Sequence, residues 1–190
     1  MADLYWRMLT PNIQRVLDLG CGHGGFGKRK PEESVVIGVD RDPLVLETAC
    51  AHYDHVFLAD LEQGILGFEN ESFDGVLARD ILEHLHEPWN MVDEIHRVVK
   101  PGGTVIASVP MAKPSVVWSD YTHVRGFTKK AIRSLFEDCG FRIRDVFPMG
   151  GYSFSDRMRI TRFMPFLMKM PGAGLLAVSY QLVAEKPAGD

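Results

Sequence analysis

The residues Val16-Leu-Asp-Leu-Gly-Cys-Gly-His-Gly-Gly-Phe-Gly27 join a short apolar strand to a turn rich in glycine. Glycine lets the backbone bend sharply and approach a ligand where a Cβ would collide, so such a turn is typical of sites that hold an adenosine group. The segment Gly20-Cys-Gly-His-Gly-Gly25 also matches the dinucleotide-binding pattern G-x-G-x-x-G, and Asp40 lies twenty residues beyond Gly20. The turn alone therefore leaves two classes of cofactor open.

Composition limits the class of protein. The chain has 190 residues, of which 46% are hydrophobic and 24% charged, and we expect residues 1–190 to form a single domain. The net charge of −4 disfavours a nucleic-acid partner. The most apolar window, residues 163–178, contains two prolines and is shorter than the ~20 residues of a spanning helix, so no transmembrane segment is expected. The spacing of the three cysteines fits neither a metal site nor a disulfide framework, which favours a cytoplasmic protein. They are Cys21, Cys50 and Cys139.

Short apolar runs alternate with helical patterns along the chain. This alternation predicts an α/β fold with a mostly parallel sheet that is covered on both faces. The expected strands are Val16–Leu19, Val35–Val39, Val56–Ala59, Gly75–Ala78, Thr104–Val109, Arg142–Phe147 and Ser179–Ala184.

Capping residues indicate where the helices begin and end. Asp42-Pro43 opens a helix to about Tyr53, with Asp42 as its cap, and a helix of at most two turns fits between Gly24 and Pro31. A third helix follows Glu87-Pro88, and a fourth begins after Thr128 and ends at Gly140. Their inward residues are expected to be Trp89, Val92, Ile95 and Val99 in the third helix, and Ala131, Ile132, Leu135 and Phe136 in the fourth.

Carboxylates recur at the ends of the predicted strands. Asp18 precedes the first glycine by two residues, where a nicotinamide-binding turn usually has an apolar residue. Asp40 ends the second strand, where it can accept hydrogen bonds from ribose hydroxyls, and Asp60 ends the third, within reach of an adenine amino group. An aspartate in this place can also act only as the cap of the next helix, but the joint register of the set favours binding. Phe73-Asp-Gly-Val-Leu-Ala-Arg-Asp80 and Val99-Lys-Pro-Gly-Gly103 complete the ordered set.

With these motifs the chain resembles the class I (Rossmann-like) S-adenosylmethionine-dependent methyltransferases from about Val16 to Ala184. The resemblance implies a seven-stranded sheet in the order 3-2-1-4-5-7-6, with strand 7 antiparallel and helices on both faces. It also implies S-adenosyl-L-methionine as the cofactor, with the methionine part near Asp18 and the glycine turn, the ribose at Asp40 and the adenine at Asp60. The cofactor-binding residues expected from it are Asp18, Gly20, Cys21, Gly22, Gly24, Asp40, Arg41, Asp60, Leu61 and Arg79.

The acceptor is expected at the loops that follow the carboxyl ends of the strands, because open α/β sheets bind ligands there. The loop Arg79-Asp-Ile-Leu-Glu-His-Leu-His-Glu87 resembles the Asp-x-x-Glu-His pattern of small-molecule methyltransferases of the ubiquinone-biosynthesis type, which places Asp80 and His84 beside the acceptor. No metal site is expected, since adjacent histidine and glutamate on a short helix rarely converge. Ser119-Asp-Tyr-Thr-His-Val-Arg-Gly-Phe-Thr128 resembles a His-x-x-x-Phe-Thr segment, and His123 is the leading candidate for a general base. The alternative is that His123 only pins its loop to the backbone.

Two segments leave several roles open. Residues 148–178, between strands 6 and 7, are rich in methionine and basic residues and are interpreted as a lid over the acceptor. A dimer or partner surface and a peripheral membrane contact through residues 157–178 are the alternatives. Residues 4–9 are expected to form a short helix, either over the mouth of the cofactor site or packed against the sheet.

Together these features predict methyl transfer to a small-molecule acceptor by in-line displacement, with an oxygen or carbon nucleophile favoured, in a monomer or homodimer. Two rivals stay open. A nicotinamide-dependent oxidoreductase would explain the glycines and Asp40, and a non-catalytic cofactor-binding scaffold would explain the lack of a diagnostic base.

Overall fold

A seven-stranded sheet forms the centre of the computed structural model, which describes residues 2–9, 13–150 and 177–188. The strand order is β3-β2-β1-β4-β5-β7-β6, and β7 runs antiparallel to both of its neighbours. The order and direction predicted from the sequence are therefore confirmed. The strands are β1 (Arg15–Leu19), β2 (Val35–Asp40), β3 (His55–Leu58), β4 (Phe73–Arg79), β5 (Val99–Pro110), β6 (Arg142–Gly150) and β7 (Ala177–Glu185).

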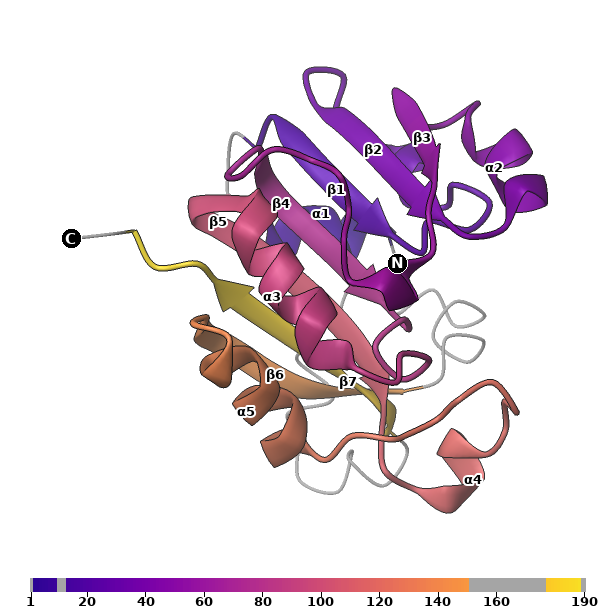
Figure 1. The fold of residues 1–190 in the computed structure, drawn as a ribbon, viewed down its shortest axis with the longest axis vertical. Helices are drawn as coiled ribbons and strands as arrows, with labels where there is room; N and C mark the ends of the chain where they lie inside the picture. The colour runs from indigo at the N-terminus through magenta and orange to yellow at the C-terminus, as the bar shows by residue number, and fades with distance from the viewer. Residues whose placement is uncertain (1, 10–12, 151–176, 189–190) are drawn as a thin grey trace.

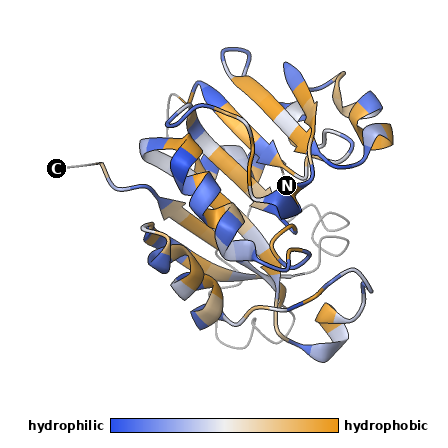
Figure 2. Cartoon of the chain, in the orientation of Figure 1, coloured by the Kyte–Doolittle hydropathy of each residue, from blue (hydrophilic) through white to orange (hydrophobic). Residues whose placement is uncertain are grey.

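Helices cover both faces of this sheet (Figure 1). One apolar cluster lies between the sheet and α3 and α5, and a second lies between the sheet and α1 and α2. Figure 2 shows the strands mainly hydrophobic and the outer surface of α3 mainly hydrophilic. The helices are α1 (Ala2–Met8), α2 (Pro43–Ala49), α3 (Pro88–Val98), α4 (Pro114–Val117) and α5 (Lys129–Asp138), with single 3-10 turns η1 (Gly27–Arg29) and η2 (Leu61–Gln63).

The predicted caps of α2 and α5 are confirmed. The Asp42 carboxylate accepts a hydrogen bond from the amide of Leu44 at 2.9 Å, and Thr128 Oγ1 accepts one from the amide of Ala131 at 3.1 Å. Helix α5 is followed by Gly140 in the left-handed region, at φ +88°. These contacts join residues two or three positions apart, which is why the sequence alone could predict them.

Four local predictions are wrong, among them the placement of Val99 in the third helix, since Val99 begins β5. Helix α2 ends at Ala49 rather than near Tyr53, because residues 51–54 form turns that bring Tyr53 against Asp18. Trp89 and Ala131 are exposed, since the inner stripe of α3 runs instead through Met91, Val92, Ile95 and Val98, and that of α5 through Ile132 and Phe136.

Helix α1 covers the face of the sheet beside the glycine turn, where the sequence predicts a helix of at most two turns. The helix expected between Gly24 and Pro31 is only the 3-10 turn η1. Trp6 of α1 stacks on Phe26 with ring centroids 4.4 Å apart, and the fully buried Tyr5 donates a hydrogen bond to Gln181. Of the two places open to residues 4–9, the structure therefore shows packing against the sheet.

The lid interpretation of residues 148–178 falls almost wholly on residues 151–176, which lie outside the described residues. Within the part of the chain that is described, none of the helices has the length and apolar character to cross a bilayer.

Candidate functional site

A pocket of about 180 Å³ opens where β1, β2, β3 and β4 end. Its lining includes many of the predicted site residues: Gly20, Asp40, Arg41, Asp60, Leu61, Asp80 and His84. Sequence reasoning missed three others, Glu62, Ile81 and Leu85. Each of the three is adjacent in sequence to a predicted site residue, so the position of these loops could have indicated them. The remaining predicted residues lie behind this lining or beside it.

Asp40 ties the glycine turn to the end of β2. Its Oδ2 accepts a hydrogen bond from the amide of Gly22 at 2.9 Å, and its Oδ1 accepts one from the amide of Asp42 at 3.1 Å. Each carboxylate oxygen has a second lone pair, so both can also accept from a ligand hydroxyl. A ligand with two adjacent hydroxyls, such as a ribose, fits this arrangement.

Gly20 lies in the left-handed region at φ +67°, and a Cβ built on it would overlap Cδ1 of Ile81. The positive φ favours glycine here, and the side chain of Ile81 would have to move to admit a larger residue. The amides of Gly20 and Cys21 donate to the carbonyl of Val39 at 2.8 and 3.0 Å, which holds the turn against β2. Cys21 is buried behind the turn, and burial raises the pKa of its thiol to about 12. Gly22 and Gly24 also have positive φ, at +50° and +82°, and shape the turn without lining the pocket.

Asp18 lies beneath the turn rather than in the pocket. Its side chain is fully buried, accepts a hydrogen bond from Tyr53 Oη at 2.5 Å and forms an ion pair with Arg79 Nη2 at 3.1 Å. Burial raises the pKa of the carboxyl, although the Arg79 charge and the Tyr53 hydrogen bond oppose that change. Asp18 therefore has no exposed atom to offer a ligand, and its influence on one would be indirect, through the position of Arg79 at the carboxyl end of β4.

Asp60 has a capping role in the structure. Its Oδ1 accepts from the amide of Glu62 at 3.1 Å and so begins η2. Because Asp60 also lines the pocket, the cap and the predicted contact with an adenine amino group are compatible. Leu61, which is almost fully buried, supplies an apolar wall beside it.

The residues around the pocket thus fit an adenosyl group. One carboxylate ends β2 and another follows β3, the apolar side chain of Leu61 also lines the pocket, and a glycine at positive φ allows close approach of the backbone. The same carboxylate at the end of β2 disfavours a 2′-phosphate.

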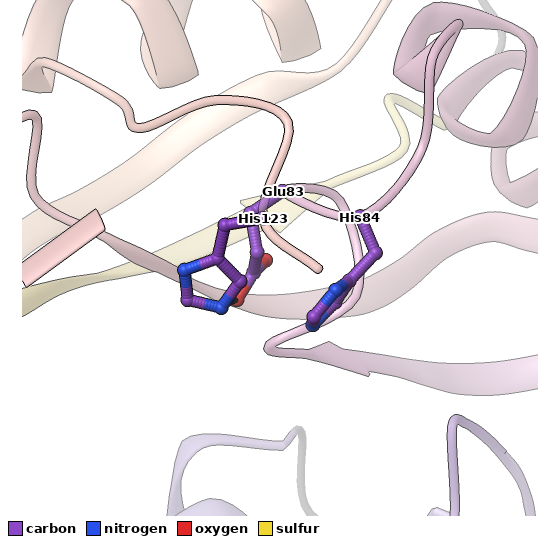
Figure 3. Close-up of side chains that lie close together, drawn as sticks. All are labelled: Glu83, His84 and His123. Atoms are coloured by element: carbon purple, nitrogen blue, oxygen red, sulfur yellow. Dashed lines mark ion pairs between the residues drawn. The ribbon is translucent and has the colours of Figure 1, made fainter. Parts of the chain in front are cut away.

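A second set of groups converges beside the pocket: Glu83 and His84 from the loop after β4, and His123 from the loop between α4 and α5 (Figure 3). One ionisable atom of each residue lies within 4.8 Å of the others, so the three groups converge although adjacent histidine and glutamate on a short helix are expected to do so rarely. The sequence could not reveal this, because 39 positions separate His84 from His123. The distance from His123 Nε2 to Glu83 Oε1 is 4.0 Å, which is wider than the roughly 3.5 Å between neighbouring ligands of a tetrahedral zinc with bonds of ~2.1 Å.

Glu83 is 1% exposed, and its Oε2 has no hydrogen-bond partner among the described residues. Burial raises the pKa of its carboxyl to about 8, and the nearby Asp80 charge acts in the same direction. Asp80 accepts a hydrogen bond from Ser108 Oγ at 2.8 Å and is held at φ +54°, a conformation that aspartate tolerates better than most residues. Glu83 therefore stays protonated to a higher pH than an exposed glutamate does.

The two histidines are placed differently. His84 lines the pocket, whereas His123 lies behind it with 13% of its side chain exposed. Nδ1 of His123 lies 2.8 Å from the carbonyl of Val117, so the backbone does pin this ring, as the alternative interpretation of His123 expected.

Comparison with known proteins shows similarity to methyltransferases. A family described as a methyltransferase domain matches residues 17–107. A ubiquinone biosynthesis O-methyltransferase from Maricaulis maris is 28% identical over 187 residues, which cover 92% of this chain and 72% of the relative. One from Pseudomonas syringae pv. tomato is 30% identical, over 70% of this chain and 66% of the relative. The chain spans about half the length of several other relatives that it matches.

Solved structures agree on the fold. A methyltransferase from Archaeoglobus fulgidus, described as dependent on S-adenosylmethionine, superposes with a TM-score of 0.73 at 19% identity, over 98% of this chain and 95% of the other. At that identity the likeness concerns the fold alone.

Proposed function

Because the chain belongs to the S-adenosylmethionine-dependent methyltransferases, we propose that it methylates an oxygen or carbon nucleophile of a small-molecule acceptor. The observation that carries the proposal is the junction of two features at one edge of the sheet. A pocket suited to an adenosyl group lies there, and a group of titratable side chains, of which Glu83 is buried, adjoins it at His84.

The cofactor, when bound, supplies a methyl group already activated by a sulfonium charge. The main tasks of the protein are then to orient the donor and to exclude water. In the proposal Asp40 binds the ribose hydroxyls, Asp60 and Leu61 hold the adenine, and Gly20 and Arg79 border the methionine end. Asp18 supports this end by fixing the guanidinium of Arg79.

The titratable groups support an acceptor that loses a proton. An alcohol or an acidic C–H needs a base to become a good nucleophile, whereas a neutral amine is nucleophilic without one. Asp80, His84 and His123 lie on the acceptor side of the pocket in the proposal, which fits the first two acceptor types. The names of the two relatives from Maricaulis and Pseudomonas, which are O-methyltransferases, agree with an oxygen acceptor.

In this proposal residues 1–190 form one domain, and the protein is cytoplasmic. Residues 151–176, the part of the expected lid that lies between β6 and β7 in the sequence, cover the acceptor in this proposal, on the strength of their composition and of that position.

Calorimetry with S-adenosylhomocysteine and with NAD⁺ tests the cofactor, and the proposal expects binding of the first alone. Transfer of label from methyl-labelled S-adenosylmethionine to separate pools of small metabolites, RNA and protein tests the acceptor. Label confined to the metabolite pool, in a product with a new O-methyl or C-methyl group, is the expected result. Preference for NAD⁺ would overturn the function, and label in RNA or protein alone would overturn the acceptor class.

A further inference from the structure

The hydrogen bonds of His84 determine which of its ring nitrogens carries the proton. Nδ1 lies 3.0 Å from Oγ1 of Thr122 and 3.3 Å from the carbonyl oxygen of the same residue. A carbonyl oxygen can only accept, so that contact requires Nδ1 to donate. The contact with the hydroxyl is decided by what else Thr122 binds.

The hydroxyl proton of Thr122 is donated to Asp120. Oγ1 of Thr122 donates to Oδ1 of Asp120 at 2.7 Å, and the Thr122 amide donates to the same oxygen at 2.9 Å. These two hydrogen bonds lower the pKa of the Asp120 carboxyl, which is therefore an anion and an acceptor at neutral pH. With its proton committed, Oγ1 can only accept from His84. Both partners of Nδ1 thus require the Nδ1–H tautomer, and the lone pair of a neutral His84 ring is left on Nε2.

The two histidines then have different tasks. His84 lines the pocket together with Gly20, Asp80 and Ile81, so its lone pair is available on the acceptor side. His123 also donates from Nδ1, to the carbonyl of Val117, but its Nε2 faces the carboxyl of Glu83 at 4.0 Å. His123 is therefore paired inside the cluster, while His84 lies at its open edge.

We propose that His84 is the base that receives the acceptor's proton, and that Thr122 and Asp120 are positioning residues that hold it in the Nδ1–H tautomer. This inference rests on the proposed function. It deepens that function by choosing His84 over His123, and it requires an acceptor whose nucleophilic atom bears a proton, such as a hydroxyl.

The step balances without a further reagent. The acceptor's electron pair forms a bond to the methyl carbon while the carbon–sulfur bond breaks with its electrons moving to sulfur. The acceptor's proton passes to Nε2 of His84, and the positive charge formerly on sulfur then resides on the imidazolium. Asp120 compensates that charge through Thr122, and release of the proton to water restores the base.

Other titratable groups lie near the His84 ring. Glu83 and Asp80 belong to the same loop, and His123 contacts it edge to face with centroids 4.8 Å apart. The amide of Val124 donates to the carbonyl of Glu83 at 2.9 Å, which fastens the loop that carries Thr122 to the loop that carries His84. The pairing of His84 with Thr122 is therefore built into two tethered loops.

Nuclear magnetic resonance of the imidazole nitrogens reads the tautomer directly, without an acceptor. Protein labelled with ¹⁵N-histidine and saturated with S-adenosylhomocysteine is used, and His84→Gln assigns the signal. We expect the Nδ1–H form in the native protein. Thr122→Val leaves only the longer contact with the carbonyl and is expected to yield a mixture with the Nε2–H form, whereas Thr122→Ser retains the native form. Thr128→Val, which removes a threonine cap elsewhere, is the matched control and leaves His84 unchanged.

Turnover with the acceptor found by label transfer provides the second measurement. His84→Gln is expected to lower kcat more than 100-fold, and Thr122→Val about 10-fold, with the affinity for S-adenosylhomocysteine unchanged and rescue by Thr122→Ser. An Nε2–H tautomer in the native protein would overturn the inference, as would full activity of His84→Gln. A stoichiometric divalent metal in the purified protein, with His84 signals that move when a chelator removes it, would also overturn it. If the tautomer is as expected but no acceptor is methylated, the proposed function fails instead.

Discussion

Arg79 and Asp18 form an ion pair at 3.1 Å at the carboxyl ends of β4 and β1, with the Asp18 side chain fully buried. The guanidinium also lies over the ring of Tyr5, 5.2 Å from its centroid, so helix α1 packs directly on the pair. Burial removes the hydration of the Asp18 carboxylate, and the Arg79 cation and the Tyr53 hydroxyl compensate for that loss. The ring of Tyr5 in turn contacts Arg79. This set of contacts supports the glycine turn from below.

Removing the cation should expose the cost of this burial. We expect Arg79→Met to lower the free energy of unfolding by about 3–5 kcal/mol, because the buried Asp18 carboxylate loses its charged partner. Asp18→Asn alone should cost less, and adding it to Arg79→Met should recover part of the loss. Urea denaturation of the two single variants and the double variant measures this coupling, and additive effects would contradict it.

Asp40 is expected to control cofactor affinity. Asp40→Ala removes the acceptor for the proposed ribose hydroxyls and for the Gly22 amide, and we expect S-adenosylhomocysteine to bind more weakly by roughly 1–3 kcal/mol. Calorimetry measures the change. Asp42→Ala is the control, since Asp42 caps α2, and it should cost about 1 kcal/mol of stability without changing affinity. Equal affinities of the Asp40→Ala and native proteins would refute the ribose assignment.

Gly20 is constrained by both backbone conformation and space, whereas Gly22 is constrained by conformation alone. A Cβ at Gly22 would have no neighbour within 4 Å, but one at Gly20 would overlap Ile81. We expect Gly22→Ala to cost about 1 kcal/mol of stability from its positive φ, and Gly20→Ala to cost more. Denaturation curves compare the two, and Ile81→Ala in the Gly20→Ala background should restore part of the difference. Equal losses would show that the overlap with Ile81 carries no energy.

Glu83 should make stability depend on pH. Its pKa is raised from the ordinary 4.5 to about 8 in the folded protein, so the folded state holds an additional proton between these values. The corresponding stabilisation relative to the ionised form is complete below about pH 4.5 and is lost as the pH rises through 8. We expect the free energy of unfolding to fall by up to roughly 5 kcal/mol over this range, from the size of the pKa difference.

Denaturation of the native protein and of Glu83→Gln at several pH values isolates this contribution. The variant, which has no proton to lose at this position, should show a flatter profile between pH 4.5 and 8 and lose less stability over that range. Glu62→Gln changes an exposed carboxylate of the same pocket and should leave the native profile in place. Parallel profiles for the native protein and Glu83→Gln would contradict the burial effect.

Much of the architecture could be predicted from residues that are close together in the chain. The Asp42 and Thr128 caps, the glycine turn and the end of α5 at Gly140 depend on backbone preferences and on contacts over two to four positions. Alternation of apolar runs with helical patterns located all seven strands, and their order followed from the family resemblance. The carboxylates at the ends of β2 and β3 lie at the pocket for the same reason, because parallel strands end at one edge of the sheet.

The partners of the buried charges depend on the packed fold. Asp18 contacts Tyr53 and Arg79, which lie 35 and 61 positions away, and no local pattern indicates either contact. His84 meets Thr122 in the same way, across 38 positions and two loops. Hydrogen-bond direction, burial and charge compensation arise only where packing brings such groups together. For this reason the family and the cofactor pocket could be inferred from the chain, whereas the choice between two histidines required their surroundings.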